Sequence, residues 1–390
     1  MVVKKRRMAR KLKKRIVFVT GTRADYGKLK SIIKIVQKNN KFEPVVFVTG
    51  MHNLSSYGNT HTELNKDKIK NLFKLNNQIK NDSMDIIVSK TISVFSKFIK
   101  KIKPDLIVIH GDRVEPLAFA IVGSLNNILV AHIEGGEVSG TVDEILRHSI
   151  SKLSHVHFVS NKKAKQRLVQ MGEIPNNIFI IGSPDVDLMS SKYIPSLNSA
   201  KKRYKIKFDN FAILLFHPVV SEKEKDKLKK KTKILLDAIK FSKFNFIVIF
   251  PNNDAGSKII LNEYKSLKKN KNIKIFPSLR FEYYLSLLKA SNFIIGNSSS
   301  GVREAPYYGT PTINIGNRQN KRSSSKSIIN IDFNKEIIKK LINRFKKKKI
   351  ILKKKKEFGI GKADKKFVSI ISKKSFWSID NQKYFKDKIL

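Results

Sequence analysis

Residues 127–152 read NILVAHIEGGEVSGTVDEILRHSISK, and this stretch decides the fold. The apolar run 127–131 predicts a buried strand, and the glycines that follow it predict a loop. A strand that ends in a glycine loop before a helix is where α/β proteins place their ligands. His132 and Glu134 stand at the end of the strand, where packing alone has no use for them. A ligand site is therefore favoured over a plain turn before a salt-bridged surface helix.

A helix is predicted directly after Thr141, which has the spacing of a capping box with Glu144. Positions four apart are neighbours on a helix, so Asp143 shares a face with Arg147. Glu144 shares the next face with His148. The helix therefore brings two acids to the same loop that carries Glu134.

Strand-like and helix-like segments alternate on both sides of this stretch. In the first half, strands are predicted at 16–20, 45–49, 105–110, 127–131 and 155–160, with helices at 28–38, 93–101, 114–125 and 161–171. In the second half, strands are predicted at 211–217, 246–250, 273–276, 293–295 and 312–315, with a helix at 337–345. This βαβ rhythm is typical of a parallel, doubly wound sheet. An α/β protein with two Rossmann-like domains facing each other across a cleft is predicted.

The pattern loosens into Ser, Asn, Pro and Lys over 184–204, which places the domain linker there. Residues 1–14 are expected to be a disordered basic arm. An N-terminal domain is expected over 15–190 and a C-terminal domain over 205–365. The remaining tail, 366–390, is considered as a helix that packs back on the N-terminal domain.

The composition is strongly basic, with 80 Lys and Arg against 31 Asp and Glu and a formal net charge of +49. Such a balance suggests nucleic acid, an anionic membrane or an anionic substrate. The cations are mostly lysines spread along the whole chain, so solvated surface lysines are the first interpretation. An anionic substrate is the second and nucleic acid the third. We therefore expect neither nucleic acid nor a membrane as a partner.

The chain has no cysteine, which excludes disulfides and thiolate metal sites and fits a cytoplasmic location. No apolar run approaches the length of a membrane helix, and 16–20 is too short for the core of a signal peptide. His155 and His157 share a strand face, but no third metal ligand accompanies them, so they are interpreted as ordinary strand residues. No metal or cofactor is expected.

Two loops of the first half carry charged side chains at strand ends. Residues 21–27, GTRADYG, join the first strand to the first helix, where Arg23 suits an anion. They lack the G-x-G-x-x-G dinucleotide fingerprint, and an ordinary βα turn is the alternative. Residues 110–113, HGDR, end another strand, and Asp112 is either a helix cap or a functional carboxylate. With Glu134 nearby, two carboxylates could serve one sugar as base and acid.

The second half repeats this arrangement. His217 ends its first strand, and PNNDAGS at 251–257 follows the next. GNSSSGVRE at 296–304 runs from an apolar strand into a hydroxyl-rich loop and a helix, where amides and hydroxyls can cradle a diphosphate. Glu304 lies one turn into that helix, where an acid can hold a ribose diol. A serine helix cap is the alternative, but it explains only one of the three serines.

These motifs together resemble the hydrolysing UDP-N-acetylglucosamine 2-epimerases of sialic and related nonulosonic acid biosynthesis, and the epimerase half of the animal bifunctional epimerase/ManNAc kinase. The resemblance runs from about residue 15 to about residue 365. The matching stretches are GTRADYGKL (21–29), YGNT (57–60), HGDR (110–113), HIEGGEVSGTVDEILRHSISKLSH (132–155), HP (217–218), PNNDAGS (251–257), GNSSSGVRE (296–304) and GTPTINIGNRQ (309–319).

The resemblance implies a GT-B-like fold with the active site between the domains. It implies anti elimination of UDP from UDP-GlcNAc to 2-acetamidoglucal and then hydration to ManNAc, without nicotinamide or metal. It also implies a homo-oligomer, either a dimer or a tetramer. The implied catalytic residues are Asp112, Glu134, Asp143 and His217, the last near the UDP phosphates. The implied UDP-binding residues are Arg23, Ser298, Ser299 and Glu304, with Lys28, Arg113 and Asn253 as second choices.

Other functions stay open at this point. UDP-N,N'-diacetylbacillosamine, on the route to legionaminic acid, would use the same chemistry with a different sugar. A non-hydrolysing epimerase and a basic binding protein on an inactive scaffold are the further alternatives. The presence of all four predicted catalytic residues argues against the inactive scaffold.

Overall fold

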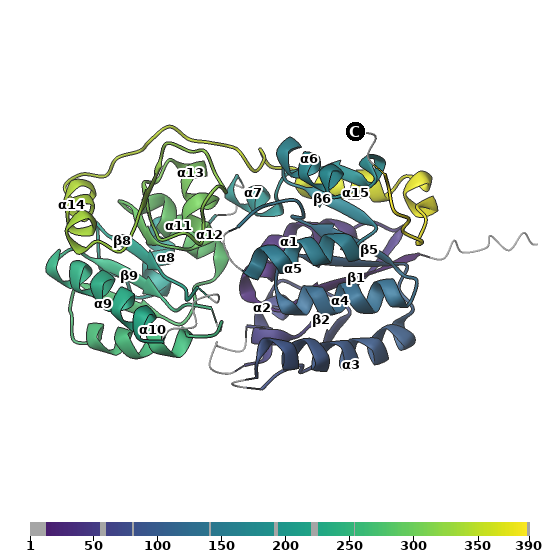
Figure 1. Cartoon of the computed structure of the whole chain (residues 1–390), viewed down its shortest axis with the longest axis horizontal. Coiled ribbons are helices and arrows are strands. Elements are labelled where there is room, and N and C mark those ends of the chain that lie inside the picture. The colour runs from purple at the N-terminus through teal and green to yellow at the C-terminus, as the bar shows by residue number, and fades with distance from the viewer. Residues whose placement is uncertain are drawn as a thin grey trace, which may run out of the picture.

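The computed structural model describes residues 13–54, 60–79, 82–139, 142–190, 194–219, 225–252 and 254–387. Two parallel sheets stand side by side, one built from each half of the chain, with helices on both faces of each (Figure 1). The predicted α/β architecture of two doubly wound units is confirmed. No helix of the described ranges is long and apolar enough to cross a membrane.

The first sheet has seven strands in the order β3-β2-β1-β4-β5-β6-β7, and every pair is parallel. The strands are β1 (Lys14–Thr20), β2 (Phe42–Val48), β3 (Leu72–Lys74), β4 (Leu106–His110), β5 (Leu129–Ile133), β6 (Val156–Val159) and β7 (Ile178–Ile180). The order reverses between β1 and β4. Ligands of open α/β sheets bind at such a switch point, beyond the carboxyl ends of the strands.

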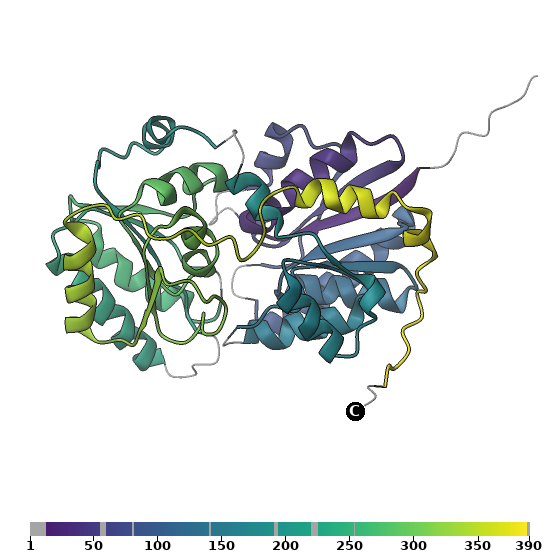
Figure 2. The same ribbon diagram turned by 90° about the horizontal axis from the view of Figure 1, so that it is seen from above.

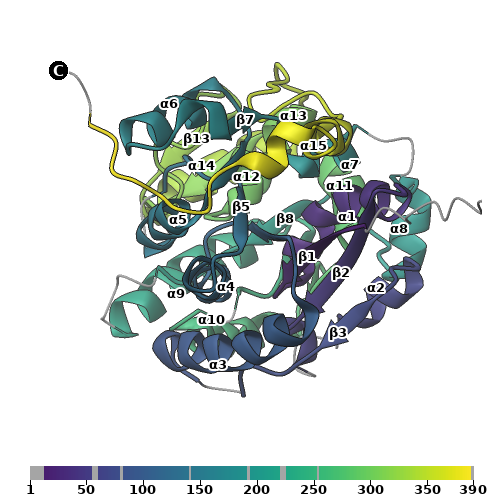
Figure 3. The same ribbon diagram turned by 90° about the vertical axis from the view of Figure 1, so that its right-hand side faces the viewer.

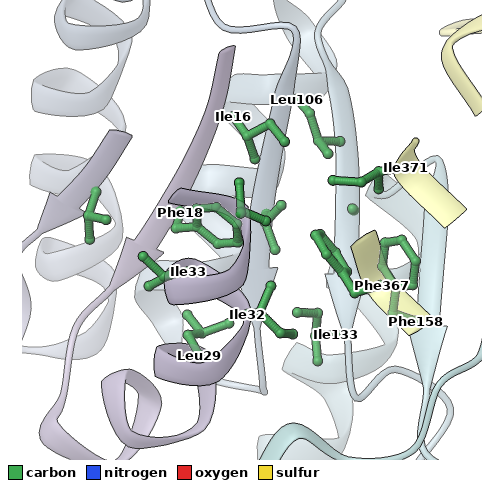
Figure 4. Packing of buried hydrophobic residues seen from close by; sticks show 14 of the residues in the cluster. Ile16, Phe18, Leu29, Ile32, Ile33, Leu106, Ile133, Phe158, Phe367 and Ile371 are labelled. Atoms are coloured by element: carbon green, nitrogen blue, oxygen red, sulfur yellow. The ribbon is translucent and has the colours of Figure 1, made fainter. Parts of the chain in front are cut away.

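Helices cover both faces of this sheet, so its strands are apolar on both sides (Figure 3). Ile16 and Phe18 of β1 face a core shared with α1 (Arg23–Gln37) and α15 (Ala363–Ile371) (Figure 4). Val17 and Val19 face the other core. That second core is completed by α3 (Met84–Ile102), α4 (Val114–Leu125) and α5 (Val142–Leu153). The remaining elements of this half are α2 (Thr62–Lys66), α6 (Lys162–Gln170), α7 (Pro184–Met189), and the 3-10 turns η1 (Gly50–Asn53) and η3 (Pro175–Asn177).

The second sheet has six parallel strands in the order β10-β9-β8-β11-β12-β13, with its own switch point between β8 and β11. The strands are β8 (Ala212–Leu215), β9 (Phe246–Ile249), β10 (Ile273–Phe276), β11 (Ile294–Gly296), β12 (Thr312–Ile315) and β13 (Ile328–Ile331). One face carries α9 (Lys225–Phe241), α10 (Ser257–Tyr264) and α14 (Lys335–Lys346). The other carries α8 (Leu197–Arg203), α11 (Phe281–Ala290) and α13 (Glu304–Tyr308). The short helix α12 (Ser299–Val302) begins just after β11, and the 3-10 turns η4 (Lys265–Leu267) and η5 (Lys374–Ser378) complete the set.

The chain connects the two units twice. It leaves the first unit through α7 and returns to it after α14, so that α15 lies on the first sheet (Figure 2). Phe367 of α15 packs 4.6 Å from Phe158, measured between ring centroids. The two connections touch, because the Ser183 N–H donates to the carbonyl of Phe358 at 2.7 Å. The last helix therefore completes the core of the first unit.

Two helix starts differ from the sequence prediction. The first helix was predicted from Lys28 but begins at Arg23, because the Thr22 hydroxyl accepts a hydrogen bond from the Asp25 N–H at 3.1 Å and caps it. Most of the predicted 21–27 loop is thus helical. Helix α3 begins at Met84, nine residues before the predicted start. The prediction missed β3, β7 and β13, which are short strands at or near sheet edges.

Candidate active site

A cleft of about 300 Å³ lies where the switch points of the two sheets face each other. Loops after β1, β4 and β5 line it from the first unit, and loops after β8, β9 and β11 line it from the second. Every predicted site residue that the structure describes lines this cleft: Arg23, Lys28, Asp112, Arg113, Glu134, Asp143, His217, Ser298, Ser299 and Glu304. Asn253 lies outside the described residues.

Glu134 is the most enclosed of the three predicted catalytic acids. It follows β5 in the left-handed region at φ 70°, and its carboxylate is surrounded by hydrogen-bond donors. Lys28 Nζ lies 3.4 Å away and His110 Nε2 3.2 Å away. The Arg303 guanidinium and the Ser183 hydroxyl also donate to it. Burial raises the pKa of Glu134, but Arg303, Lys28 and His110 together hold it well below its usual range, so the carboxylate is ionised.

Asp112 and Asp143 are more accessible than Glu134. Their side chains are 29% and 22% exposed, against 8% for Glu134. Asp112 pairs with the buried Arg147 of α5. Burial raises the pKa of Asp112, but Arg147 and then Arg322 lower it well below its usual range. Asp143, in the first turn of α5, pairs with Arg318 of the second unit at 3.1 Å. Two carboxylates thus stand at the cleft surface and a third beneath them.

Two histidines near these acids have different roles. His110, which sequence reasoning did not select, lies between Asp25 at 3.5 Å and Glu134 at 3.2 Å. Burial lowers its pKa, but the two carboxylates raise it to about 9, so the imidazole is protonated. The position of His132 at a strand end predicts a ligand site, but His132 does not line the cleft. It is fully buried, and its Nε2–H donates to the Gly111 carbonyl at 2.8 Å, so it supports the loop after β4.

His217 is a neutral donor on the opposite wall. Its main chain is held by the Asn297 side chain, with bonds of 2.7 and 2.8 Å in both directions. The Asn252 N–H donates to its Nδ1 at 3.1 Å, which leaves the proton on Nε2. Burial, followed by Arg318 and Arg113, lowers the pKa of His217 well below its ordinary value.

Ser298, Ser299 and Ser300, which follow β11, complete this wall. Ser298 caps α12 by accepting a hydrogen bond from the Ser300 N–H at 3.3 Å, and Ser298 and Ser299 both line the cleft. Glu304 is buried, and its Oε2 makes no hydrogen bond to the residues described. Burial, then the neighbouring Asp185, raises the pKa of Glu304. A buried carboxyl with an unsatisfied oxygen is available to a polar ligand.

The other predicted cations make polar contacts around the cleft, and two of them, Arg23 and Arg113, reach the second unit. Arg23 pairs with Glu63 at 2.8 Å and donates to Ser278 of the second unit. Arg113 lies 3.6 Å from Asp254, also of the second unit. Lys28 lies between Glu134 and Asp185, 3.8 Å from the latter. The two units are therefore held together by charge pairs that cross the cleft.

Sequence reasoning missed several cleft residues, which are Glu137, Arg147, His110, Arg303, Arg318 and Arg322. For Arg147 one indication of a role in the site was present in the sequence: it stands four residues after Asp143 and therefore shares a helix face with it. Arg303 and Arg318 lay inside quoted motifs, but nothing in their spacing named their partners. Among the residues described, no three His, Asp or Glu side chains gather as a metal ion would require.

Comparison with known proteins connects this geometry to a family. A family model described as UDP-N-acetylglucosamine 2-epimerase matches residues 34–372. The UDP-N-acetylglucosamine 2-epimerase of Neisseria meningitidis serogroup B is 47% identical over 320 residues, which cover 82% of this chain and 84% of that protein. The UDP-N,N'-diacetylbacillosamine 2-epimerase (hydrolyzing) of Legionella pneumophila is 34% identical over 323 residues, 82% of this chain and 85% of that one.

Solved structures show the same fold. UDP-GlcNAc 2-epimerase from Methanocaldococcus jannaschii, in complex with UDP-GlcNAc and UDP, superimposes with a TM-score of 0.78 at 25% identity. The match covers 92% of this chain and 99% of that one. A Neisseria meningitidis UDP-GlcNAc 2-epimerase bound to UDP-GlcNAc gives 0.76 at 21% identity, with the same coverage. The predicted GT-B-like architecture is that of these neighbours.

Proposed function

Because the chain belongs to the UDP-N-acetylglucosamine 2-epimerase family, we propose that it is a hydrolysing member, which converts UDP-N-acetylglucosamine and water into free N-acetylmannosamine and UDP. One observation carries the proposal. Three carboxylates from β4, β5 and α5 meet, across one cleft, a wall of hydroxyl, imidazole and guanidinium donors from the second unit. That arrangement supplies proton transfer on one side and stabilisation of an anionic leaving group on the other.

The chemistry divides into two steps that need both sides. In the first, a carboxylate takes the proton from C2 of the sugar, the C1=C2 bond forms, and the C1–O bond to UDP breaks with its electrons leaving on the diphosphate. In the second, water adds its oxygen to C1 and gives up a proton to a carboxylate, while a carboxylic acid delivers a proton to C2 on the face opposite to the one that was deprotonated. We assign the base and the acid to the set Asp112, Glu134 and Asp143.

The environments of the three acids support this assignment. Asp112 and Asp143 expose the most surface to the cleft and can meet the sugar ring. Glu134 is ionised deeper in the site, within reach of the protonated His110. The imidazolium of His110 thus helps to hold Glu134 in the ionised form that a base requires.

The second unit is suited to hold UDP. His217 offers a neutral Nε2–H, Ser298 and Ser299 offer hydroxyls, and Arg318 offers a guanidinium at the cleft surface. Donors fixed before the reaction stabilise the charge that develops on the leaving oxygen. The buried carboxyl of Glu304 is proposed for the ribose. Arg23, Lys28, Arg113 and Asn253 are proposed as further contacts of the nucleotide.

The relatives favour UDP-N-acetylglucosamine over UDP-N,N'-diacetylbacillosamine, because the relative named for the former is 47% identical and the one named for the latter 34%. We propose further that the enzyme is a cytoplasmic homo-oligomer and that its product feeds sialic or related nonulosonic acid synthesis. The diacetylated sugar is the second candidate substrate, supported by the hydrolysing relative.

Incubation with each UDP-sugar in deuterated water, followed by NMR, tests the proposal. The expected product is a free 2-epimerised sugar that carries deuterium at C2, with one UDP released per sugar. The faster substrate identifies the sugar. A 2-epimer that still carries UDP would mean a non-hydrolysing enzyme. No UDP release from either sugar by folded protein would exclude both hydrolysing candidates.

A further inference from the structure

We propose that Arg303, supplied by the nucleotide-binding half, is a positioning residue that holds the catalytic carboxylate Glu134 of the other half oriented for reaction. The inference rests on the proposed function. It assigns a residue that does not belong to the predicted catalytic or UDP-binding sets. It implies that the acid site is complete only when the two halves of the cleft are closed on each other.

The Arg303 side chain is 1% exposed and lies almost entirely among groups of the first unit. Its guanidinium donates to Glu134, to Glu137 at 2.7 Å and to Asp185 at 3.3 Å. It also donates to Ser183, and the Ser183 hydroxyl in turn donates to Glu134. A planar guanidinium with several bonds fixes both the distance and the orientation of a carboxylate. Glu134 is thus held directly and through one hydroxyl.

Arg303 is itself held firmly by the second unit. It is the residue between α12 and α13, three positions after Ser300 and directly before Glu304. The Thr312 hydroxyl donates to the Gly301 carbonyl at 2.7 Å and ties α12 to β12. The guanidinium carbon of Arg303 lies over the ring of Phe358, 4.5 Å from the ring centroid. Groups proposed to contact UDP therefore flank the residue that reaches the catalytic acid.

The charges around Glu134 show what Arg303 contributes. Lys28 from α1 and His110 from β4 face Glu134 from the first unit, while Glu137 and Asp185 are like charges close by. Without Arg303, three buried carboxylates would share Lys28, His110 and the Arg322 that contacts Glu137 at 3.0 Å. The pKa of Glu134 would then rise, because burial would be opposed by Lys28 and His110 alone.

The test compares Arg303→Met, which keeps an unbranched apolar stem without the charge, with Arg303→Lys, which keeps the charge. In Arg303→Met we expect kcat at pH 7 to fall roughly 100-fold, within the range for loss of a positioned proton-transfer group, while KM and the UDP dissociation constant stay within about threefold. The acidic limb of the kcat–pH profile should move to higher pH. Arg303→Lys should recover part of kcat and most of the pH profile.

Folding controls separate positioning from a merely structural role. The double variant Arg303→Met/Glu137→Gln removes one buried carboxylate along with the cation, so its thermal midpoint should recover. Its kcat should stay low, because Glu134 still lacks its partner; Glu137→Gln alone supplies the reference. Equal losses of kcat and UDP affinity, or an acidic limb that does not move, would overturn the inference.

A second measurement needs no turnover, so it tests Arg303 even if the proposed reaction is wrong. A carboxylate with a raised folded-state pKa stabilises the protein below that pKa and loses this stability as pH rises. The thermal midpoint of Arg303→Met should therefore increase from pH 7 to pH 5 relative to wild type. The increase should vanish in Arg303→Met/Glu134→Gln, and its persistence there would contradict the assignment to Glu134.

Discussion

The cleft and a second ionic cluster in the first unit each bury a histidine beside a glutamate, with opposite results. In the cleft, His110 faces Glu134 and Asp25 and is protonated. In the second cluster, which we call the tail cluster and which consists of His157, Glu173, Lys152 and Lys383, burial lowers the pKa of the histidine and it is neutral. None of these four residues lines the cleft.

The difference comes from how many charges share each glutamate. Glu173 already receives Lys383 at 2.6 Å and Lys152 at 3.0 Å, so His157 can donate a hydrogen bond without carrying a charge. Two carboxylates compete for His110, which keeps its proton. Lys383 also donates to the carbonyls of Lys152 and Ser154 at the end of α5, so the tail cluster anchors the chain terminus. A histidine shared by two carboxylates therefore keeps its proton, whereas a histidine whose glutamate already contacts two lysines is neutral.

The variant with the largest expected effect is Glu134→Gln, which tests the cleft side of this comparison. The amide keeps the size of the side chain but cannot accept a proton, so we expect kcat to fall roughly 10³-fold while the UDP dissociation constant changes little. Single-turnover assays and calorimetry with UDP measure the two quantities. Retained turnover would remove Glu134 from the catalytic set.

The counterpart in the tail cluster is Glu173→Gln. It removes the anion that Lys383 and Lys152 contact, and Lys152 is 53% exposed and can be solvated, so we expect the free energy of unfolding to fall by about 3 kcal/mol, with kcat nearly unchanged below the unfolding temperature. Urea unfolding and steady-state assays give both values. A large loss of kcat in fully folded protein would show that the tail cluster also serves the reaction.

His110→Asn tests the protonated histidine. The wild-type imidazole has a raised pKa, so its stabilising charge is fully present below its ordinary pKa near 6.5 and is lost as pH rises through about 9. The stability of wild type over the variant should therefore shrink by about 2 to 3 kcal/mol between pH 7 and pH 10. Unfolding curves at these pH values measure it, and a constant difference would mean that His110 is neutral.

His157→Gln should have the smallest effect. The neutral amide can still donate to Glu173, so we expect a loss of about 1 kcal/mol at pH 7. Because the pKa of His157 is lowered, wild type loses stability from this residue as pH falls below about 6.5, and the variant does not. The difference in unfolding free energy between wild type and His157→Gln should thus become smaller as pH falls. The difference between wild type and His110→Asn should become smaller as pH rises. Narrowing on the alkaline side would contradict the charge states assigned here.

The parts of the fold that local pattern determines could be predicted from the sequence. The helix predicted at 114–125 is α4, and Asn161, the first residue of the helix predicted at 161–171, caps α6 by accepting a hydrogen bond from the Ala164 N–H at 2.9 Å. The carboxyl ends of parallel strands share one edge of a sheet, which brings Asp112 and Glu134 together. His217 lies at the corresponding edge of the second sheet and lines the same cleft. Thr141 of the predicted capping box lies outside the described residues, so the capping box stays a prediction; Glu144 accepts a hydrogen bond from the Ser139 N–H at 3.0 Å.

What escaped prediction are the partners of these groups. Arg303 and Glu134 are 169 positions apart, and Arg318 and Asp143 are 175 apart. No periodicity or cap relates residues at such separations; the packing of two sheets against each other brings them together. The prediction that His132 marks a ligand site was wrong for a related reason. Its hydrogen bond to the Gly111 carbonyl depends on the packing of two strands and could not be seen in the sequence.

The two connections between the units have a mechanical consequence. A Cβ at Gly359 would lie 3.1 Å from the Gly182 Cα, so the two chain segments run against each other where they pass between the units. A single linker allows two units both to bend and to twist relative to each other. Two linkers that lie side by side allow bending but resist the twist. Any opening of the cleft must therefore bend both connections together, and their contact opposes a twist of one unit against the other. The path of the two connections thus favours the alignment in which Arg303 meets the carboxylates of the first unit.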